Sequence, residues 1–278
     1  MKKIYRIINK FALFVLIQII SKILKQFRFI IVPQLNNINL TNFTYSNLTR
    51  RLIFNKNKKI FNSIIIDSTL TNTKLCDIGK KYGTNKSPIN LNGHRIGYTG
   101  IYSLLFSQIK NKKINFAEIG IEKNASIKMW REYFSLAYIY AFEYDDLKIA
   151  AAKKNNLKKT LYFKINVKDE KSINESFYKT RSKFDVIIDD STHNFNDQIR
   201  IIKNCYKFLN PGGILIIEDI FKYKKEHAEI NYYKNLKNYI KFFTEIFFID
   251  TEHVNNFTSN YKCEKILLLI KKWTIILI

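Results

Sequence analysis

Acidic and histidine side chains gather at two points in the sequence where a short apolar run ends. The residues that follow the runs FDVII and ILII are Asp189, Asp190 and His193 in the first case and Glu218 and Asp219 in the second. If both runs are strands of one parallel sheet, their carboxyl ends meet at the same edge. Asp190, Glu218 and Asp219 could then converge as three oxygen donors, a set that favours Mg²⁺ or a similar hard cation over zinc.

His193 lies on the loop beside these acids and is a candidate general base. A cation at the acids would lower the pKa of a substrate hydroxyl, and an imidazole with an ordinary pKa near 6.5 is suited to removing the proton. A lone histidine more often caps a loop or packs in the core. The neighbouring carboxylates favour the catalytic interpretation here.

A second group of residues is typical of a nucleoside-binding site. Glu118 and Gly120 end the run INFAEI, where a glycine lets the backbone approach a ligand and the next helix offers free N–H groups. Glu143 ends the following apolar run, about 20 residues after Gly120, and a carboxylate there can accept ribose hydroxyls. The alternatives are a plain strand-to-helix turn and a solvated loop acid.

The elements that must position these residues alternate between strand and helix patterns, which predicts a doubly wound, mostly parallel α/β sheet. Residues 1–33 are expected to form a basic and apolar helical extension, residues 34–74 a linker or irregular segment, and residues 75–278 the catalytic domain. The seven predicted strands cover residues 114–119, 137–142, 160–165, 184–188, 214–217, 245–249 and 265–270.

The net charge of +24 invites a nucleic-acid interpretation. Lys, Asn and Ile are overused along the whole chain, as an AT-rich coding bias would produce, and no recognised RNA- or DNA-binding motif accompanies the charge. We therefore do not expect specific nucleic-acid binding. The three cysteines, Cys76, Cys205 and Cys263, are odd in number and widely spaced, which fits a reducing, cytoplasmic compartment.

The N-terminus contains the apolar run FALFVLIQII at residues 11–20, with Lys and Arg on both sides. A spanning helix needs about 20 apolar residues, so this run is too short to cross a membrane alone. The sequence leaves open whether residues 1–32 lie on a membrane surface or pack against the domain.

The ordered set of motifs resembles class I S-adenosylmethionine (SAM) methyltransferases. The resemblance is to the metal-dependent sugar O-methyltransferases of macrolide biosynthesis (mycinamicin and tylosin type) and to cephalosporin-hydroxylase-like relatives, and it extends over about residues 75–272. The motifs are Lys81-Tyr82-Gly83-Thr84-Asn85-Lys86, Tyr98-x-x-x-Tyr102, Glu118-Ile119-Gly120 with Ser126, Met129 and Trp130, Glu143, Asp189-Asp190-Ser191-Thr192-His193, and Pro211-Gly212-Gly213 before Glu218-Asp219.

This resemblance implies SAM and Mg²⁺ (or a similar divalent cation) as cofactors. It also implies that Asp190, Glu218 and Asp219 hold the cation and that His193 is the base. Residues 82–86 would close over SAM. The expected SAM-binding residues are Lys81, Tyr82, Gly83, Thr84, Glu118, Gly120, Ser126, Glu143 and Asp189.

Three positions depart from the family pattern. Asn124 stands where glycine is usual, and asparagine is the residue that next best tolerates a positive φ. Asn85 and Glu143 each replace an aspartate. These departures affect the expected cofactor site, whereas the expected metal set is intact.

The sequence therefore predicts a SAM-dependent, Mg²⁺-assisted O-methyltransferase acting on a hydroxyl of a sugar or other small molecule. It does not indicate the oligomeric state. Two other classes stay open: a nucleic-acid methyltransferase or RNA-binding protein that uses the basic surface, and a catalytically silent, membrane-associated relative. An oxidation of the cephalosporin-hydroxylase type is disfavoured because His193 has no companion histidine at a strand end.

Overall fold

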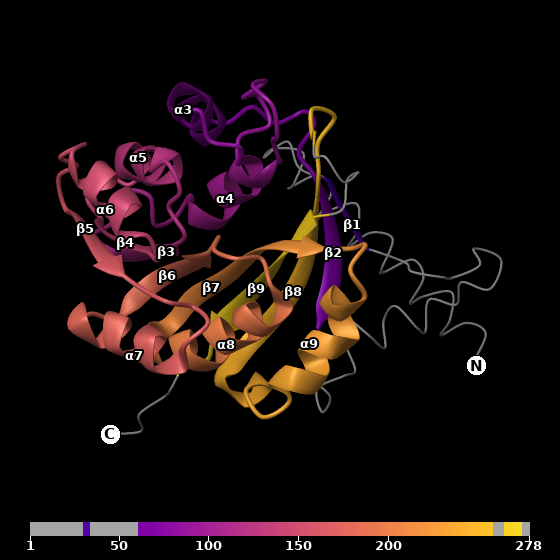
Figure 1. The fold of residues 1–278 in the computed structure, drawn as a ribbon. Helices are drawn as coiled ribbons and strands as arrows, with labels where there is room; N and C mark the ends of the chain where they lie inside the picture. The colour runs from indigo at the N-terminus through magenta and orange to yellow at the C-terminus, as the bar shows by residue number, and fades with distance from the viewer. Residues whose placement is uncertain (1–29, 34–60, 258–263, 274–278) are drawn as a thin grey trace, which may run out of the picture.

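The computed structural model describes residues 30–33, 61–257 and 264–273. A single sheet runs through the molecule, with helices on both of its faces (Figure 1). The strands are β1 (Ile30–Pro33), β2 (Asn62–Asp67), β3 (Asn115–Ile119), β4 (Tyr138–Glu143), β5 (Thr160–Lys164), β6 (Phe184–Asp189), β7 (Leu209–Phe221), β8 (Phe243–Glu252) and β9 (Glu264–Lys271). The helices are α3 (Lys74–Tyr82), α4 (Tyr98–Phe106), α5 (Ala125–Tyr133), α6 (Asp146–Lys153), α7 (Glu170–Lys179), α8 (Phe195–Cys205) and α9 (Glu229–Leu236).

The strand order is β1-β2-β8-β9-β7-β6-β3-β4-β5. Strands β5, β4, β3, β6 and β7 pair in parallel, and β9 lies antiparallel between β7 and β8. The seven strands expected from the sequence correspond to β3 through β9, so the predicted doubly wound, mostly parallel sheet is confirmed. The strand count was too low, because β1 and β2 extend the sheet beyond β8.

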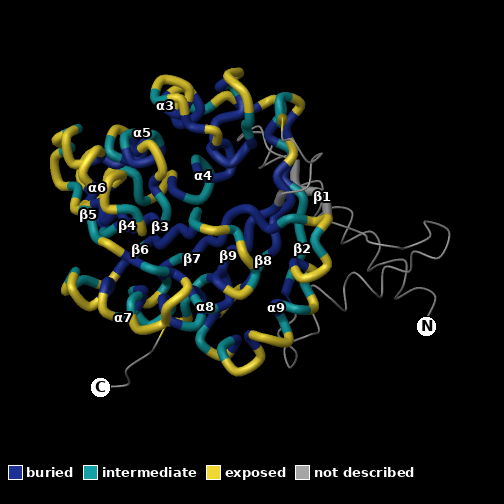
Figure 2. The backbone as a smooth tube through the Cα atoms, in the orientation of Figure 1, coloured by how far each residue is buried: buried dark blue, intermediate teal, exposed yellow. Residues whose placement is uncertain are grey.

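Two clusters of buried apolar residues lie between the sheet and its helices. Figure 2 marks the buried positions along the backbone in dark blue. Helices α3, α4 and α5 cover one face, where Leu75, Ile101 and Trp130 are fully buried. Helices α7, α8 and α9 cover the other face and bury Phe177 and Ile202 against it. The sheet is therefore covered on both sides, and its strand ends are where polar side chains can gather.

The N-terminal part differs from the expectation in two places. Residues 30–33 form strand β1 rather than the end of a helix, and residues 62–67 form β2 within the segment expected to be irregular. The apolar residues of β2 pair in parallel with β8, which supplies the hydrogen-bond partner that a local sequence pattern does not reveal. The predicted helix over residues 1–29 lies outside the described residues. Within the described ranges, no helix has the length and apolar character needed to cross a membrane.

Candidate active site

Three acids meet on one face of the sheet because they adjoin residues that pair in register across β3, β6 and β7. Ile119 of β3 pairs with Asp189 of β6, which pairs in turn with Ile217 of β7. Successive side chains of a strand point to opposite faces. Glu118, Asp190 and Glu218 therefore lie on the face covered by α3, α4 and α5. Of the three acids expected to converge, Asp190 and Glu218 lie on this face.

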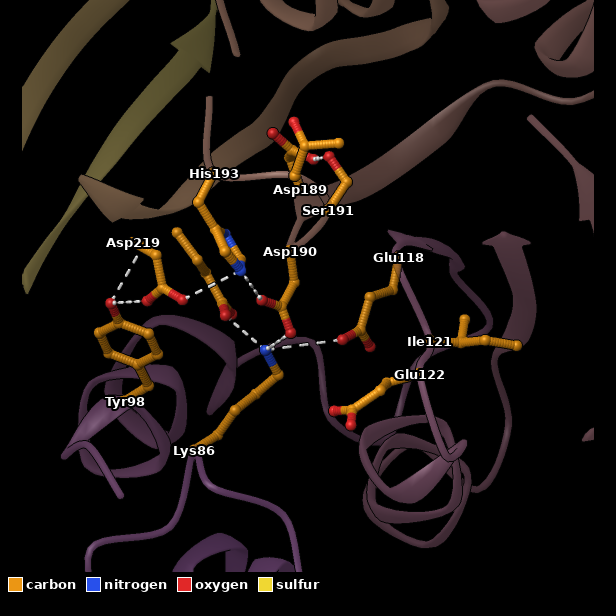
Figure 3. A network of polar contacts seen from close by, with 12 residues as sticks. Lys86, Tyr98, Glu118, Ile121, Glu122, Asp189, Asp190, Ser191, His193 and Asp219 are labelled. Atoms are coloured by element: carbon orange, nitrogen blue, oxygen red, sulfur yellow. Dashed lines mark hydrogen bonds and ion pairs between the residues drawn. The ribbon is translucent and has the colours of Figure 1, made fainter. Parts of the chain in front are cut away.

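Asp189 lies on the opposite face. In Figure 3 it points away from Lys86 and toward Ser191, whose hydroxyl donates to its Oδ1 at 2.6 Å. Burial raises the pKa of Asp189 to about 7, and the Ser191 hydrogen bond opposes that rise. The structure thus separates this residue from the acid group to which its neighbour Asp190 belongs.

Asp219 and His193 face each other from two strained turns. The pairing of β7 with β9 shifts between Ile217 and Ile220, and this bulge turns Asp219 toward the site. Both Asp219 (φ 54°) and His193 (φ 52°) adopt the left-handed backbone that residues other than glycine rarely occupy. His193 Nε2 lies 3.5 Å from Asp219 Oδ2 and 4.0 Å from Asp190 Oδ1.

The loop after α3 places Lys86 among the acids, a contact that the sequence did not predict. Its ammonium donates to Asp190 Oδ2 at 2.6 Å and to Glu218 Oε2, and it lies 3.6 Å from Glu118 Oε1 (Figure 3). The side chain is only 2% exposed. Lysine is almost never buried to this extent unless it is paired.

Burial and charge set the pKa values within this group. Burial alone would lower the pKa of Lys86, but the adjacent carboxylates of Asp190, Glu218 and Glu118 raise it well above its ordinary value. Burial raises the pKa of Glu118 to about 7 even though Lys86 opposes the rise. The pKa of Glu218 is also raised, again because of burial. One ammonium does not fully compensate this many buried acids.

Two tyrosines of α4 form hydrogen bonds with Glu218 and Asp219, which lie near the carboxyl end of β7. Tyr98 Oη donates to Asp219 Oδ1 at 2.7 Å, and Tyr102 Oη donates to Glu218 Oε1 at 2.5 Å. Tyr98 and Tyr102 are four residues apart on one helix, so they present their hydroxyls on the same face. The Tyr-x-x-x-Tyr spacing in the sequence was therefore a usable signal for this contact.

The strand-to-helix turn at Gly120 is fixed from two sides. A Cβ on Gly120 (φ 89°) would meet the backbone of Asp190, so glycine is required for the packing of these two loops. Glu143 Oε2 accepts the backbone N–H groups of Ile121 and Glu122, and its Oε1 accepts those of Tyr144 and Asp145. Glu143 thus stabilises the turn, and its role toward ribose stays a prediction.

Asn124 adopts the backbone conformation for which asparagine was expected to substitute for glycine. It has a φ of 65° at the N-terminus of α5, and its side chain donates to Tyr162 Oη at 3.0 Å. Ser126, in the first turn of the same helix, is buried. The departure at residue 124 therefore leaves the turn intact.

Part of the loop expected to close over a cofactor faces away from the acids. Lys81 Nζ and Tyr82 Oη both donate to Glu132 of α5, at 2.6 and 2.8 Å, near the surface. Gly83 ends α3 in the left-handed conformation, and Thr84 is buried behind it. Lys86 is the residue of this motif that enters the site.

The donors of Asp190, His193 and Asp219 fit a divalent cation. One ligand atom from each lies within 4.8 Å of the other two. Glu218, the third acid expected in the metal set, is instead engaged by Lys86 and Tyr102. The geometry therefore brings together two of the three expected acids, Asp190 and Asp219, with His193 beside them, while Lys86 pairs with Asp190 Oδ2 and Tyr98 with Asp219 Oδ1.

Glu118 offers a place for a second cationic group. Its side chain is fully buried, its ion pair with Lys86 is long at 3.6 Å, and neither of its oxygens accepts a hydrogen bond of ordinary geometry within the described part of the chain. The side chains of Ser126 and Trp130 lie near this carboxylate and oppose the rise in its pKa that burial causes. A buried carboxylate without a donor is costly, so Glu118 suits a positively charged ligand that reaches this strand end.

Open space near these residues is limited in this conformation. The gap lined by Asn85, Ile96, Tyr98 and Asp219 is too small to admit a water molecule. A larger surface hollow of about 530 Å³ lies between the loop 122–124 and residues 147–155 on and after α6. None of the acids at the strand ends lines that hollow.

Comparison with known proteins relates this sequence to methyltransferases. Residues 123–266 match the family described as a methyltransferase domain. The chain is 26% identical over 132 residues to an L-olivosyl-oleandolide 3-O-methyltransferase of Streptomyces antibioticus, covering 45% of this chain and 32% of that protein. It is 20% identical over 153 residues to an 8-demethyl-8-alpha-L-rhamnosyl tetracenomycin-C 2'-O-methyltransferase of Streptomyces olivaceus, covering 52% and 37%. The chain thus spans about a third of the length of these relatives.

A solved structure shares the fold. The MycE methyltransferase of the mycinamycin biosynthetic pathway, in complex with Mg, SAH and mycinamycin VI, matches with a TM-score of 0.53 at 17% identity. The match covers 73% of this chain and 55% of that one.

Proposed function

The chain belongs to the methyltransferase domain family, and we propose that it transfers a methyl group from SAM to a hydroxyl of a sugar or another small molecule, with a divalent cation bound. The observation that carries this proposal is the convergence of Asp190, His193 and Asp219 at the carboxyl ends of β6 and β7. This arrangement places two anionic oxygen ligands beside a base. Such a combination suits an enzyme that must activate a weakly acidic hydroxyl.

His193 is the general base of the proposed reaction. Its imidazole is about a third exposed, so an acceptor can reach it, and Asp219 Oδ2 lies 3.5 Å from its Nε2. The acceptor hydroxyl gives its proton to His193 while its oxygen forms a bond to the methyl carbon and the sulfur–carbon bond of SAM breaks. Asp219 and Asp190 stabilise the imidazolium that results.

Asp190 and Asp219 would hold the divalent cation, whose contribution when bound is to lower the pKa of the acceptor hydroxyl. Tyr98 keeps the Asp219 carboxylate in place through its hydrogen bond to Oδ1, which leaves Oδ2 facing His193. The strained backbone at residues 193 and 219 fixes the directions of both side chains.

The turn formed by Gly120, Ile121 and Glu122 is the proposed binding segment for SAM. Glu118 supplies a buried carboxylate whose ion pair with Lys86 is long, at 3.6 Å, and which suits the amino group of a methionine moiety. Glu143 stabilises the turn by accepting hydrogen bonds from backbone N–H groups. It would accept ribose hydroxyls only if it lost some of these backbone donors. The preference for a sugar acceptor is supported by the rhamnosyl and olivosyl acceptors in the names of two relatives.

Titration calorimetry with SAM, with and without Mg²⁺, tests this proposal before any acceptor is known. We expect heat of binding for SAM and a separate, chelator-sensitive heat for Mg²⁺. A chain that binds neither ligand would be the catalytically silent relative, and the proposal would be abandoned. Binding of SAM without any effect of Mg²⁺ would support a SAM-dependent methyltransferase and contradict the proposed divalent cation.

A further inference from the structure

Lys86 brings a positive charge to the carboxylates that a divalent cation would need. Its Nζ contacts Asp190 Oδ2 at 2.6 Å and also contacts Glu218 Oε2, two of the three acids expected in the metal set. Only Asp219 of that set is free of this ammonium and faces His193 instead. The lysine thus occupies the side of the acid cluster on which Glu218 lies.

The other contacts of the acid cluster place the Lys86 ammonium next to any cation that binds Asp190. Glu218 Oε1 is already taken by Tyr102, so Lys86 and Tyr102 together use both oxygens of this acid. Asp190 is shared, with Oδ2 on Lys86 and Oδ1 toward His193. A dication at Asp190 and Asp219 would therefore come close to a like charge, which lowers its affinity unless the ammonium moves away.

The segment that carries Lys86 is also the one that closes the site. Asn85 and Lys86 line the narrow gap beside Tyr98 and Asp219, which is too small for water. The backbone carbonyl of Asn85 accepts the N–H of Ile96, and the backbone carbonyl of Lys86 accepts the N–H of Thr99. These hydrogen bonds tie residues 85 and 86 to the start of α4 and the residues just before it. Release of its ammonium would remove the ion pairs that tie this loop to β6 and β7.

We propose that Lys86 is a tethered cation that competes with a divalent metal ion for the carboxylate of Asp190, so that metal binding displaces its ammonium and loosens the loop around residue 86. This inference rests on the proposed metal-assisted function and assigns Lys86 a positioning role. The ammonium keeps the buried acids compensated while no metal is bound. It leaves them when a dication supplies the charge.

The first test measures the affinity of Mn²⁺ by calorimetry in the absence of SAM and acceptor. Lys86→Met should bind Mn²⁺ at least about tenfold more tightly than the unaltered chain, because the competing charge is gone. Lys80→Met, which removes an exposed lysine from α3, is the matched control and should leave the affinity unchanged. An unchanged or weaker affinity of Lys86→Met would overturn the proposal. If Lys86→Met does not fold, the double variant Lys86→Met with Glu118→Gln is measured instead, because it removes the ammonium together with a buried partner that lies outside the expected metal set.

The second test uses the unaltered chain. Its amines are acylated with acetic anhydride, and the modification at Lys86 is quantified by mass spectrometry with and without saturating Mn²⁺. We expect Lys86 to be protected without metal and to become reactive when metal is bound. Protection that persists at full Mn²⁺ occupancy contradicts displacement even if the proposed methyltransferase activity stands. If neither the chain nor its Lys86 variant binds Mn²⁺, competition is refuted together with the metal requirement, while SAM binding stays separately measurable.

Discussion

The backbone carbonyl of Asp190 lies where a side chain at position 120 would begin. A Cβ built on Gly120 would be 2.1 Å from this oxygen, at a φ of 89°. The turn that ends β3 and the loop that ends β6 therefore touch through their main chains. The proposed SAM-binding turn and the proposed metal ligand Asp190 are mechanically joined at this one point.

Gly120→Ala should destabilise the fold more than another substitution at a left-handed glycine. We expect a loss of at least about 3 kcal/mol in the free energy of unfolding, because the methyl group meets backbone atoms and the φ is unfavourable. Gly83→Ala is the control, since Gly83 has a φ of 72° but open space around it. It should cost about 1 kcal/mol. Urea unfolding measures both, and equal losses would show that the contact with Asp190 is not decisive.

His193→Ala should lower turnover about 100-fold or more and leave SAM affinity unchanged. The reason is that the imidazole faces Asp219 and Asp190 and not the turn at Gly120. Formation of S-adenosylhomocysteine with a panel of sugar-bearing acceptors measures turnover, and calorimetry measures SAM binding. His94→Ala, on the loop before α4, serves as the matched control and should keep its activity. Full activity of the His193 variant would exclude this residue as the base.

Tyr102→Phe should reduce stability by about 1–3 kcal/mol. The substitution keeps the ring that stacks on Phe106 but leaves Glu218 Oε1 without its buried donor. Urea unfolding at neutral pH is the measurement. Tyr178→Phe, on the exposed side of α7, removes a hydroxyl from a side chain that is 64% exposed and should have almost no effect. Similar values for the two variants would mean that the Tyr102 hydrogen bond contributes nothing to folding.

His227 should make the fold sensitive to mild acid. Burial lowers its pKa from 6.5 to about 4, and its Nδ1 accepts the backbone N–H of Phe221. Between pH 6.5 and about 4, His227 is therefore mainly neutral in the folded chain and mainly protonated in the unfolded chain. Stability from this residue is fully present above pH 6.5 and is lost as the pH falls toward 4, by up to about 3 kcal/mol.

The variant His227→Asn tests this pH dependence because asparagine keeps an acceptor for the Phe221 N–H and does not titrate. Its unfolding free energy should fall less steeply than that of the unaltered chain between pH 6.5 and 4.5. Parallel curves for the two proteins would show that His227 is not the source of the acid sensitivity.

Much of the acid cluster could be predicted from strand patterns. Glu118, Asp190 and Glu218 each end an apolar run, and equal strand ends with a period of two bring them to one face. The same alternation places Asp189 on the other face, and its expected contact with the cofactor stays a prediction. The strand pattern also predicted β3 to β9, because each contains a central apolar run, although β7 and β8 extend beyond the residues expected.

The contact of Lys86 with these acids could not be predicted in the same way. Residues 83–97 contain no helix or strand, so no periodicity gives the path of the loop or the direction of its side chains. Strand β2 was missed for a related reason. Its partner β8 lies far away in the sequence, and the Asn- and Lys-rich residues before it suggested an irregular segment.

The position of β9 has a consequence for how the molecule becomes functional. This strand lies between β7 and β8, although it follows both in the sequence. Until residues 264–271 have left the ribosome, β7 has an unpaired edge, and the bulge that turns Asp219 toward His193 lacks the strand against which it forms. Nascent chains that stop before residue 264 would therefore carry every proposed catalytic side chain and still have no working geometry.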